Sequence, residues 1–294
     1  MSERTKRALG EPRSQSDRKR GAEAREQSPN TKFAIGLARA FGGAVIFSLP
    51  LLMTMEMWYL GSDISGFRLV LFVVLNIPLL IALSHYIGFE DTFGFKDDLL
   101  DAFVAYGVAF VAASAALLLF GVIHPGMPVD HIVSKVSIQA VPGSIGAMLA
   151  QSEFGGEQKK KDRSKRYGDE LFIMAVGALF LALNVAPTEE VILIAQQMTD
   201  WHALALALVS LLVMHAFVFS LEFTGQVSIP EGTPFWNVFL RFTVSGYTIA
   251  LIISMYVLWT FERSDGLTLH QLLTSAIVLG FPAAVGAAAA RLII

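Results

Sequence analysis

Hydrophobic residues are concentrated in eight stretches of this chain, and each stretch is long enough to cross a bilayer as a helix. A helix needs about 20 residues to cross a hydrocarbon core about 30 Å thick. Short polar segments separate the stretches. We predict membrane-spanning helices at 33–60, 67–87, 98–123, 130–150, 170–187, 201–221, 237–261 and 268–292. The predicted fold is therefore all-α, a polytopic bundle of eight transmembrane helices.

The fourth stretch is the least hydrophobic, because it contains Lys135, Gln139 and Pro142. On hydropathy alone it could be a re-entrant or interfacial segment. The basic residues argue that it crosses: nine of the 22 lie in 1–32, and six more lie in 159–166. Basic segments flanking membrane spans stay in the cytoplasm. If 1–32 is cytoplasmic, 159–166 is cytoplasmic only when four spans precede it, so we expect eight spans and two cytoplasmic termini.

Composition agrees with a membrane protein whose main partner is the lipid bilayer. The chain is 54% hydrophobic and 16% charged, and its net charge of −3 gives no reason to expect nucleic-acid binding. It has no cysteine, which excludes disulfides, thiolate metal sites and cysteine nucleophiles. Residues 1–32 have no apolar core and so do not form a signal peptide. We expect a disordered basic tail that sets orientation; a regulatory or lipid-contacting arm is the alternative.

A sequence motif near the end of the fourth stretch recurs near the end of the eighth. PGSIGAMLA begins at Pro142 and PAAVGAAAA begins at Pro282, 140 residues later, with His131 and His270 ahead of them. The segment at 101–110 similarly resembles the one at 241–250. The pattern predicts an internal duplication, and chance similarity between apolar segments is the alternative.

The duplication divides the chain into two units of four spans. The first repeat is 33–150, the second is 169–294, and a basic cytoplasmic linker at 151–168 joins them. Because four is even, both units enter the membrane in the same direction and form parallel repeats. We expect a half-turn about the membrane normal to relate them.

The repeated motif supplies small residues at helical spacing. Gly146 and Gly286 each begin a small-x3-small pair, which lets membrane helices approach closely. Pro142 and Pro282 each remove one helical hydrogen bond and can kink the helix. These residues are therefore predicted helix-packing positions. As an alternative, these two kinked helices lie on the axis between the repeats and form a pore or a rocking interface there.

The segment GFEDTFGFKDDLLDAFVAYGVA at 88–109 and the paired P-x3-G-A motifs resemble a family of bacterial inner-membrane proteins of unknown function. The resemblance covers 33–294 and implies a multi-pass protein of the bacterial inner membrane. It implies no substrate and no functional residue.

Ionisable residues within or near spans are costly and are candidate functional sites. Glu56 lies near the outer end of the first span, and Glu189 and Glu190 lie at the equivalent end of the fifth. Simple solvation at the interface is the alternative for these carboxylates.

Three further polar residues are candidates inside the bundle. Asp101 and Arg241 lie at repeat-related positions near the inner ends of their spans, and we expect them to approach each other or to share a polar network. The alternative is that Asp101 is an ordinary carboxylate at a helix start. His215 lies within the sixth span, where it needs a partner. A structural hydrogen bond is the simpler explanation for His215, and a pathway residue is the alternative.

No metal, cofactor or catalytic site is predicted. His124, His131, His202 and His270 lie on the outer side, yet their spacing matches no metal motif. The chain lacks H-E-x-x-H, G-x-S-x-G and G-x-G-x-x-G. We therefore expect that the protein is not an enzyme.

Two classes of function remain. The first is a secondary transporter or ion conductor for an unidentified substrate, with a small ion as the expected cargo. The second is a non-transporting scaffold or sensor that acts through the basic tail and linker. Internal repeats are common among transporters, which favours the first class by analogy.

Overall fold

The computed structural model describes residues 29–87, 95–154, 167–220, 236 and 239–293. Eight helices within these residues are long and apolar enough to cross a membrane. The all-α, eight-span prediction is therefore confirmed. The basic tail up to residue 28 and most of the linker, 155–166, lie outside the described residues, as does 88–94.

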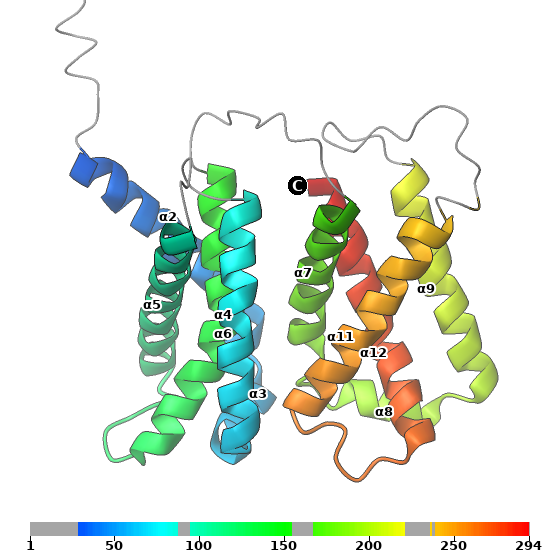
Figure 1. Ribbon diagram of the computed structural model, residues 1–294. Coiled ribbons are helices and arrows are strands. Elements are labelled where there is room, and N and C mark those ends of the chain that lie inside the picture. The colour runs from blue at the N-terminus through cyan, green and yellow to red at the C-terminus, as the bar shows by residue number, and fades with distance from the viewer. Residues whose placement is uncertain (1–28, 88–94, 155–166, 221–235, 237–238, 294) are drawn as a thin grey trace, which may run out of the picture.

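The helices fall into two groups that lie side by side (Figure 1). The first half comprises α2 (Pro29–Leu52), α3 (Met55–Asp63), α4 (Gly66–Ile87), α5 (Phe95–Leu119) and α6 (Val129–Phe154). The second half comprises α7 (Tyr167–Val185), α8 (Glu190–Gln197), α9 (Asp200–Ser220), η2 (Phe239–Val244), α11 (Ser245–Thr260) and α12 (Leu269–Ile293). The start of α2 and the end of α12 lie on one face, which we call the terminal face, and α3 and α8 lie near the opposite one (Figure 1).

The first predicted span, 33–60, is two helices rather than one. Helix α2 ends at Leu52, Thr54 is extended with φ −95° and ψ 117°, and α3 then begins. The break ends the regular hydrogen bonding of α2, and the Leu51 carbonyl accepts from the Thr54 amide at 3.2 Å. The side-chain amide of Gln139 on α6 donates to the Leu51 carbonyl at 3.1 Å. Helix α8 follows α7 after a similar interruption.

Each half is built around its last helix. Helix α6 packs against α2, α3, α4 and α5, and α12 packs against α7, α8, α9 and α11. Both central helices are among the most buried, because small residues let their neighbours approach closely.

Glycines make the closest helix contacts in both halves. A Cβ on Gly146 would collide with the backbone of Gly43, and one on Gly286 would collide with the backbone of Gly177. These contacts place the two P-x3-G-A motifs inside their own halves. Gly146 and Gly286 are therefore packing residues, and the alternative, a position of these motifs on an axis between the repeats, is not observed.

The halves meet along a thin interface. Helix α2 contacts α7, where Phe47 and Phe180 lie 4.7 Å apart between ring centroids, and α4 contacts α11. A half-turn would also bring α5 against α9. Those two helices lie at opposite outer edges instead (Figure 1), so the expected half-turn does not describe this arrangement.

Candidate functional site at the junction of the halves

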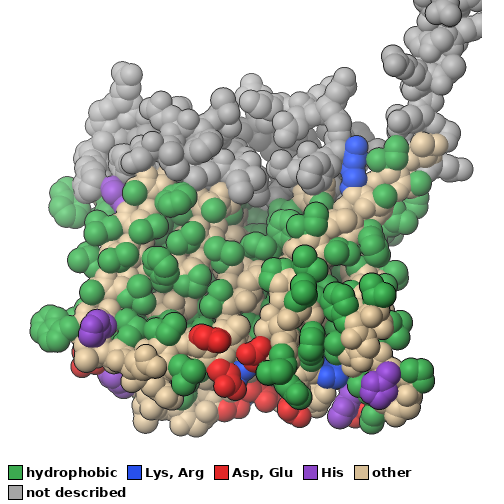
Figure 2. All heavy atoms as spheres, turned by 180° about the vertical axis from the view of Figure 1, so that it is seen from behind, with side chains coloured by type: hydrophobic (Ala, Val, Ile, Leu, Met, Phe, Trp, Pro, Cys, Tyr) green, Lys and Arg blue, Asp and Glu red, His purple; other side chains and the backbone are tan. Residues whose placement is uncertain are grey.

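Charged side chains gather on the face opposite the terminal face. Figure 2 shows Asp and Glu side chains clustered at the lower edge of the molecule, with Lys and Arg side chains among them. The exposed carboxylates near this face are those of Asp63, Asp130, Glu189, Glu190, Asp200 and Asp265. We call this the acidic face.

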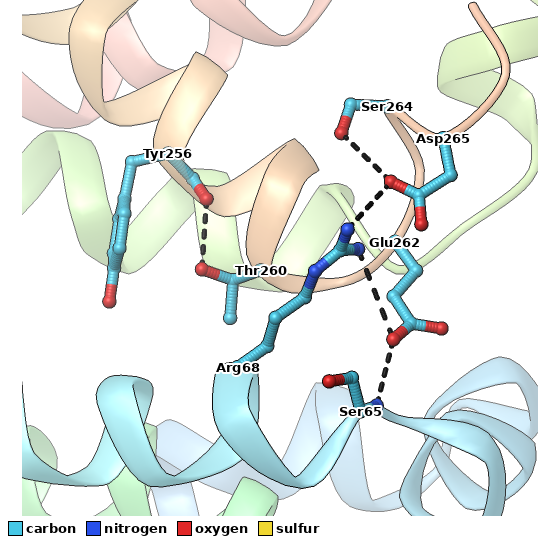
Figure 3. A network of polar contacts seen from close by, with 7 residues as sticks. All are labelled: Ser65, Arg68, Tyr256, Thr260, Glu262, Ser264 and Asp265. Atoms are coloured by element: carbon cyan, nitrogen blue, oxygen red, sulfur yellow. Dashed lines mark hydrogen bonds and ion pairs between the residues drawn. The ribbon is translucent and has the colours of Figure 1, made fainter.

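A polar cluster on the acidic face joins the two halves, and we call Ser65, Arg68, Glu262 and Asp265 the Arg68 network. Arg68 Nη2 donates to Asp265 Oδ1 at 2.9 Å, and Nη1 lies 3.9 Å from Glu262 Oε1. The backbone amide of Ser65 donates to the same Glu262 oxygen at 2.8 Å. Figure 3 shows these contacts running from the start of α4 to the loop after α11.

The start of α4 is suited to bind a carboxylate. Helix α4 begins at Gly66, so the Ser65 amide has no partner within the helix. The positive end of the helix dipole also favours an anion there. The Arg68 guanidinium lies 5.1 Å above the Trp259 ring of α11, and its side chain is only 16% exposed. The carboxylate of Glu262 therefore accepts one hydrogen bond from the other half and forms a longer ion pair with the partly desolvated guanidinium of Arg68.

Glu262 has an unusual backbone conformation. Its φ of 61° lies in the left-handed region, which costs a residue other than glycine about 1 kcal/mol. It occupies the position just after the cap of α11, where the amides of Glu262 and Arg263 donate to the carbonyls of Trp259 and Leu258. The surrounding contacts thus hold a conformation that the residue itself disfavours.

Arg263 connects this loop to the start of α8. Its guanidinium donates to the Pro187 carbonyl, and Nη1 lies 4.0 Å from Glu189 Oε1. Glu262 and Arg263 therefore point to different halves. One two-residue segment contacts both the beginning of α4 and the break between α7 and α8.

In the first half, a buried lysine on α6 contacts the backbone of α3. The Lys135 ammonium on α6 donates to the Trp58 carbonyl, and its side chain is almost fully buried. Gly61 allows α3 to pass directly over it, because a Cβ there would collide with Lys135. Lys135 therefore contacts α3, and Arg263 contacts the segment just before α8.

The predicted glutamates lie at the edge of this face. Glu56 is half-buried in the first turn of α3, Glu190 is exposed in the first turn of α8, and Glu189 precedes α8. They begin the two short helices at equivalent places. None of them lies deep in the bundle, so they form part of a charged surface.

The structure does not bring Asp101 and Arg241 together. Asp101 accepts a hydrogen bond from Ser84 at 3.0 Å within the first half. Arg241 is exposed in the second half, with its guanidinium 4.4 Å above the Tyr167 ring. Their helices α5 and η2 belong to different bundles, so the expected pairing is not observed.

His215 has a local partner in the second half. Its Nδ1 lies 2.9 Å from Thr243 Oγ1, and its ring packs edge-on against Phe239 at 5.2 Å. Thr243 is fully buried in η2, a six-residue π-helix. Such π-helical segments occur frequently at functional sites. The observed contact nonetheless fits the structural hydrogen bond expected for a histidine inside a span.

Two of the four outer histidines contact a polar side chain. His270 Nε2 lies 2.8 Å from Asp200 Oδ1, and His202 Nδ1 lies 2.8 Å from Thr199 Oγ1. Among the residues that the structure describes, no three His, Asp or Glu side chains are grouped as metal ligands would be.

Sequence reasoning did not identify Arg68, Glu262 or Asp265 as site residues. An offset of 140 residues aligns Gly121 with Phe261, so the match between Gly121 and Glu262 emerges only from the hydrogen bonds that end the two helices. The cap that follows α5 has Gly121 where the cap after α11 has Glu262, and both positions have a positive φ. A charged residue in place of a turn glycine marks a position where the side chain matters.

Comparison with known proteins agrees with this architecture. Residues 36–294 match the family described as "Putative integral membrane protein (DUF2391)". The chain belongs to this family. No curated protein and no solved structure matches it. The DUF2391 match confirms the resemblance to an uncharacterised membrane-protein family, and its description names no substrate.

Proposed function

We propose that this protein is a secondary transporter or ion conductor for a small cation, whose two halves rock against each other. The observation that carries the proposal is the packing of the bundle. Among the residues that the structure describes, each half surrounds its own central helix, α6 or α12, whereas the halves meet mainly along α2 with α7, along α4 with α11 and through the Arg68 network. Two self-contained units joined by a thin contact can move as rigid bodies, as in transporters built from repeats.

The halves are proposed to be duplicated parallel repeats. The close approach of Gly43 to Gly146 recurs at Gly177 and Gly286. Every helix that packs on α6 has a counterpart that packs on α12. These recurrences support duplication, while the contacts between the halves require a relation other than a half-turn.

The proposed cargo is a cation because of the acidic face. Glu56, Glu189, Glu190 and Asp265 contribute carboxylates to this face, and Asp265 lies at the junction itself, where it contacts Arg68. A concentration of one sign of charge at an entrance raises the local concentration of counter-ions. The basic groups Arg68 and Arg263 are each engaged with carboxylates there and so do not reverse the sign of this face.

The proposed location is the bacterial inner membrane, with the terminal face in the cytoplasm. The ends of α6 and α12 lie on the same side as the starts of α2 and α7 (Figure 1). The linker at 151–168 and the tail are rich in basic residues, which favours that side as cytoplasmic. The proposal involves no catalytic step and no cofactor.

Flux measurements test the proposal directly. The full chain is reconstituted into liposomes, and currents are recorded after concentration jumps of H⁺, Na⁺, K⁺ or Mg²⁺ on a solid-supported membrane. We expect a saturable current for one of these cations that protein-free liposomes lack. Currents equal to those of protein-free liposomes for all four would contradict the proposal and favour the scaffold or sensor.

A further inference from the structure

We propose that Glu262 is a latch that holds the two halves together on the acidic face, and that the chain accepts a strained backbone to keep its carboxylate there. This inference rests on the proposed rocking of the halves. It identifies which contact must break before the acidic face can open.

The first step is the equivalence of two helix ends. After α5, the amides of Gly121 and Val122 donate to the carbonyls of Leu118 and Leu117. After α11, Glu262 and Arg263 make the same two contacts with Trp259 and Leu258. Gly121 has φ 70° and Glu262 has φ 61°, so both turns need a left-handed residue. Glycine adopts this conformation freely, whereas glutamate does not.

The second step is the difference in surroundings. Phe120, just before Gly121, is 44% exposed, whereas Phe261, just before Glu262, is 1% exposed. Phe261 is buried because it packs edge-on against Phe72 of α4, with 5.7 Å between ring centroids. The turn with glycine lies where the halves do not meet, and the turn with glutamate lies where they do.

The third step concerns the partner of Glu262. Arg68 follows Glu56 by the same number of residues as His202 follows Glu190, so Arg68 and His202 occupy equivalent places in the two halves. Arg68 reaches across to Glu262 and Asp265, whereas His202 contacts Thr199 within its own half. Both members of the charge pair are therefore found only at the junction. If the turn needed only a residue in the left-handed conformation, glycine would meet that need.

Substitution of Glu262 by glycine removes the carboxylate and leaves a residue that adopts the left-handed turn freely. Glu262→Gly relieves the backbone strain, so it should raise the melting temperature if the side chain has no role. We expect the opposite, a fall of a few degrees, because the contacts to Ser65 and Arg68 are lost. In an Arg68→Ala background the fall should be clearly smaller. Gly121→Glu is the matched control and should also lower the melting temperature, because a glutamate there adopts the left-handed conformation at a cost while its Cβ meets no atom within 4 Å.

Distance measurements distinguish a latch from a purely local stabilising contact. Met55 and Leu269 are exposed at the starts of α3 and α12, so spin labels at Met55→Cys and Leu269→Cys report the separation of the halves near the acidic face. We expect one narrow distance distribution in the otherwise unchanged protein. Glu262→Gly, and the milder Glu262→Gln, should add a longer component, and Gly121→Glu should not.

The outcomes separate the latch from the proposed function. A raised melting temperature in Glu262→Gly, or distance distributions that stay unchanged in both Glu262 variants, would overturn the latch even if cation flux is found. A longer component in both Glu262 variants, with a lowered melting temperature in Glu262→Gly, supports the latch even if none of the tested cations is carried.

Discussion

The carboxylate of Glu262 accepts a hydrogen bond from the backbone amide of Ser65, 2.8 Å away, and so ties the end of α11 to the beginning of α4. These residues belong to different halves of the molecule. The contact uses an unsatisfied amide at a helix start and a side chain on a strained residue. It is therefore a specific link between two bundles that otherwise pack mainly within themselves.

Adjacent glycines on α2 should respond to alanine in opposite directions. A Cβ on Gly43 would collide with Gly146 and Ala150, whereas one on Gly42 would meet nothing within 4 Å. Gly43→Ala should destabilise the protein by about 1–3 kcal/mol, because the helices must separate. Gly42→Ala should be neutral or stabilising by up to about 1 kcal/mol. Unfolding in detergent measures both, and equal effects would contradict the packing described.

The equivalent close approach in the second half predicts the effect of a larger side chain. Gly286 packs against the backbone of Gly177 in the middle of its half. Gly286→Leu should therefore lower the melting temperature and loosen α12 from α7. A Gly286→Leu protein that melts like the parent would show that this contact is not tight.

The contact between His215 and Thr243 should appear as a coupling energy. Thr243→Val and His215→Ala each remove one side of a 2.9 Å contact inside a span. Hydrogen bonds between membrane helices contribute about 0.6 kcal/mol on average. The double variant should lose less stability than the sum of the single variants by about that amount. Strict additivity in the cycle would show that the two side chains do not interact.

Asp101 and Arg241 should behave as independent residues. Asp101 is bonded to Ser84 on α4, and Arg241 stacks on Tyr167 of α7, so they share none of these contacts. The effects of Asp101→Asn and Arg241→Gln on unfolding should add within about 0.3–0.5 kcal/mol. A coupling above 1 kcal/mol would restore the pairing that the sequence predicted.

Cysteine labelling tests the proposed orientation. The chain has no natural cysteine, so a single one can be introduced at an exposed residue on either face. His124→Cys, on the loop before α6, should react with a membrane-impermeant maleimide added to intact cells. Gly168→Cys, at the start of α7, should react only after the membrane is opened. The reverse pattern would place the terminal face outside.

The hydrophobic pattern was sufficient to predict the number and order of spans. Membrane helices satisfy their backbone groups internally, so length and apolar composition decide where they lie. The motif spacing also predicted that Gly146 and Gly286 are packing residues, because small side chains are needed for close helix contacts. These predictions depend on local properties of each helix.

Contacts between distant segments could not be predicted in the same way. The pairing of Asp101 with Arg241 was inferred from symmetry, and it failed because the halves are not related by the assumed half-turn. Arg68 and Glu262 are 194 residues apart in the chain, and their meeting depends on how the two halves dock. The φ of 61° at Glu262 is likewise set by the turn that ends α11 rather than by the residue type.

The most direct test of the account is to measure the separation of the halves at both faces in the same preparation. Spin labels at Met55→Cys and Leu269→Cys report the acidic face, and labels at Leu100→Cys and Leu240→Cys report the terminal face; all four residues are exposed. When Glu262→Gly releases the latch, rocking predicts that the distance at the acidic face lengthens while the distance at the terminal face shortens. A lengthening at the acidic face with no change at the terminal face would contradict rocking.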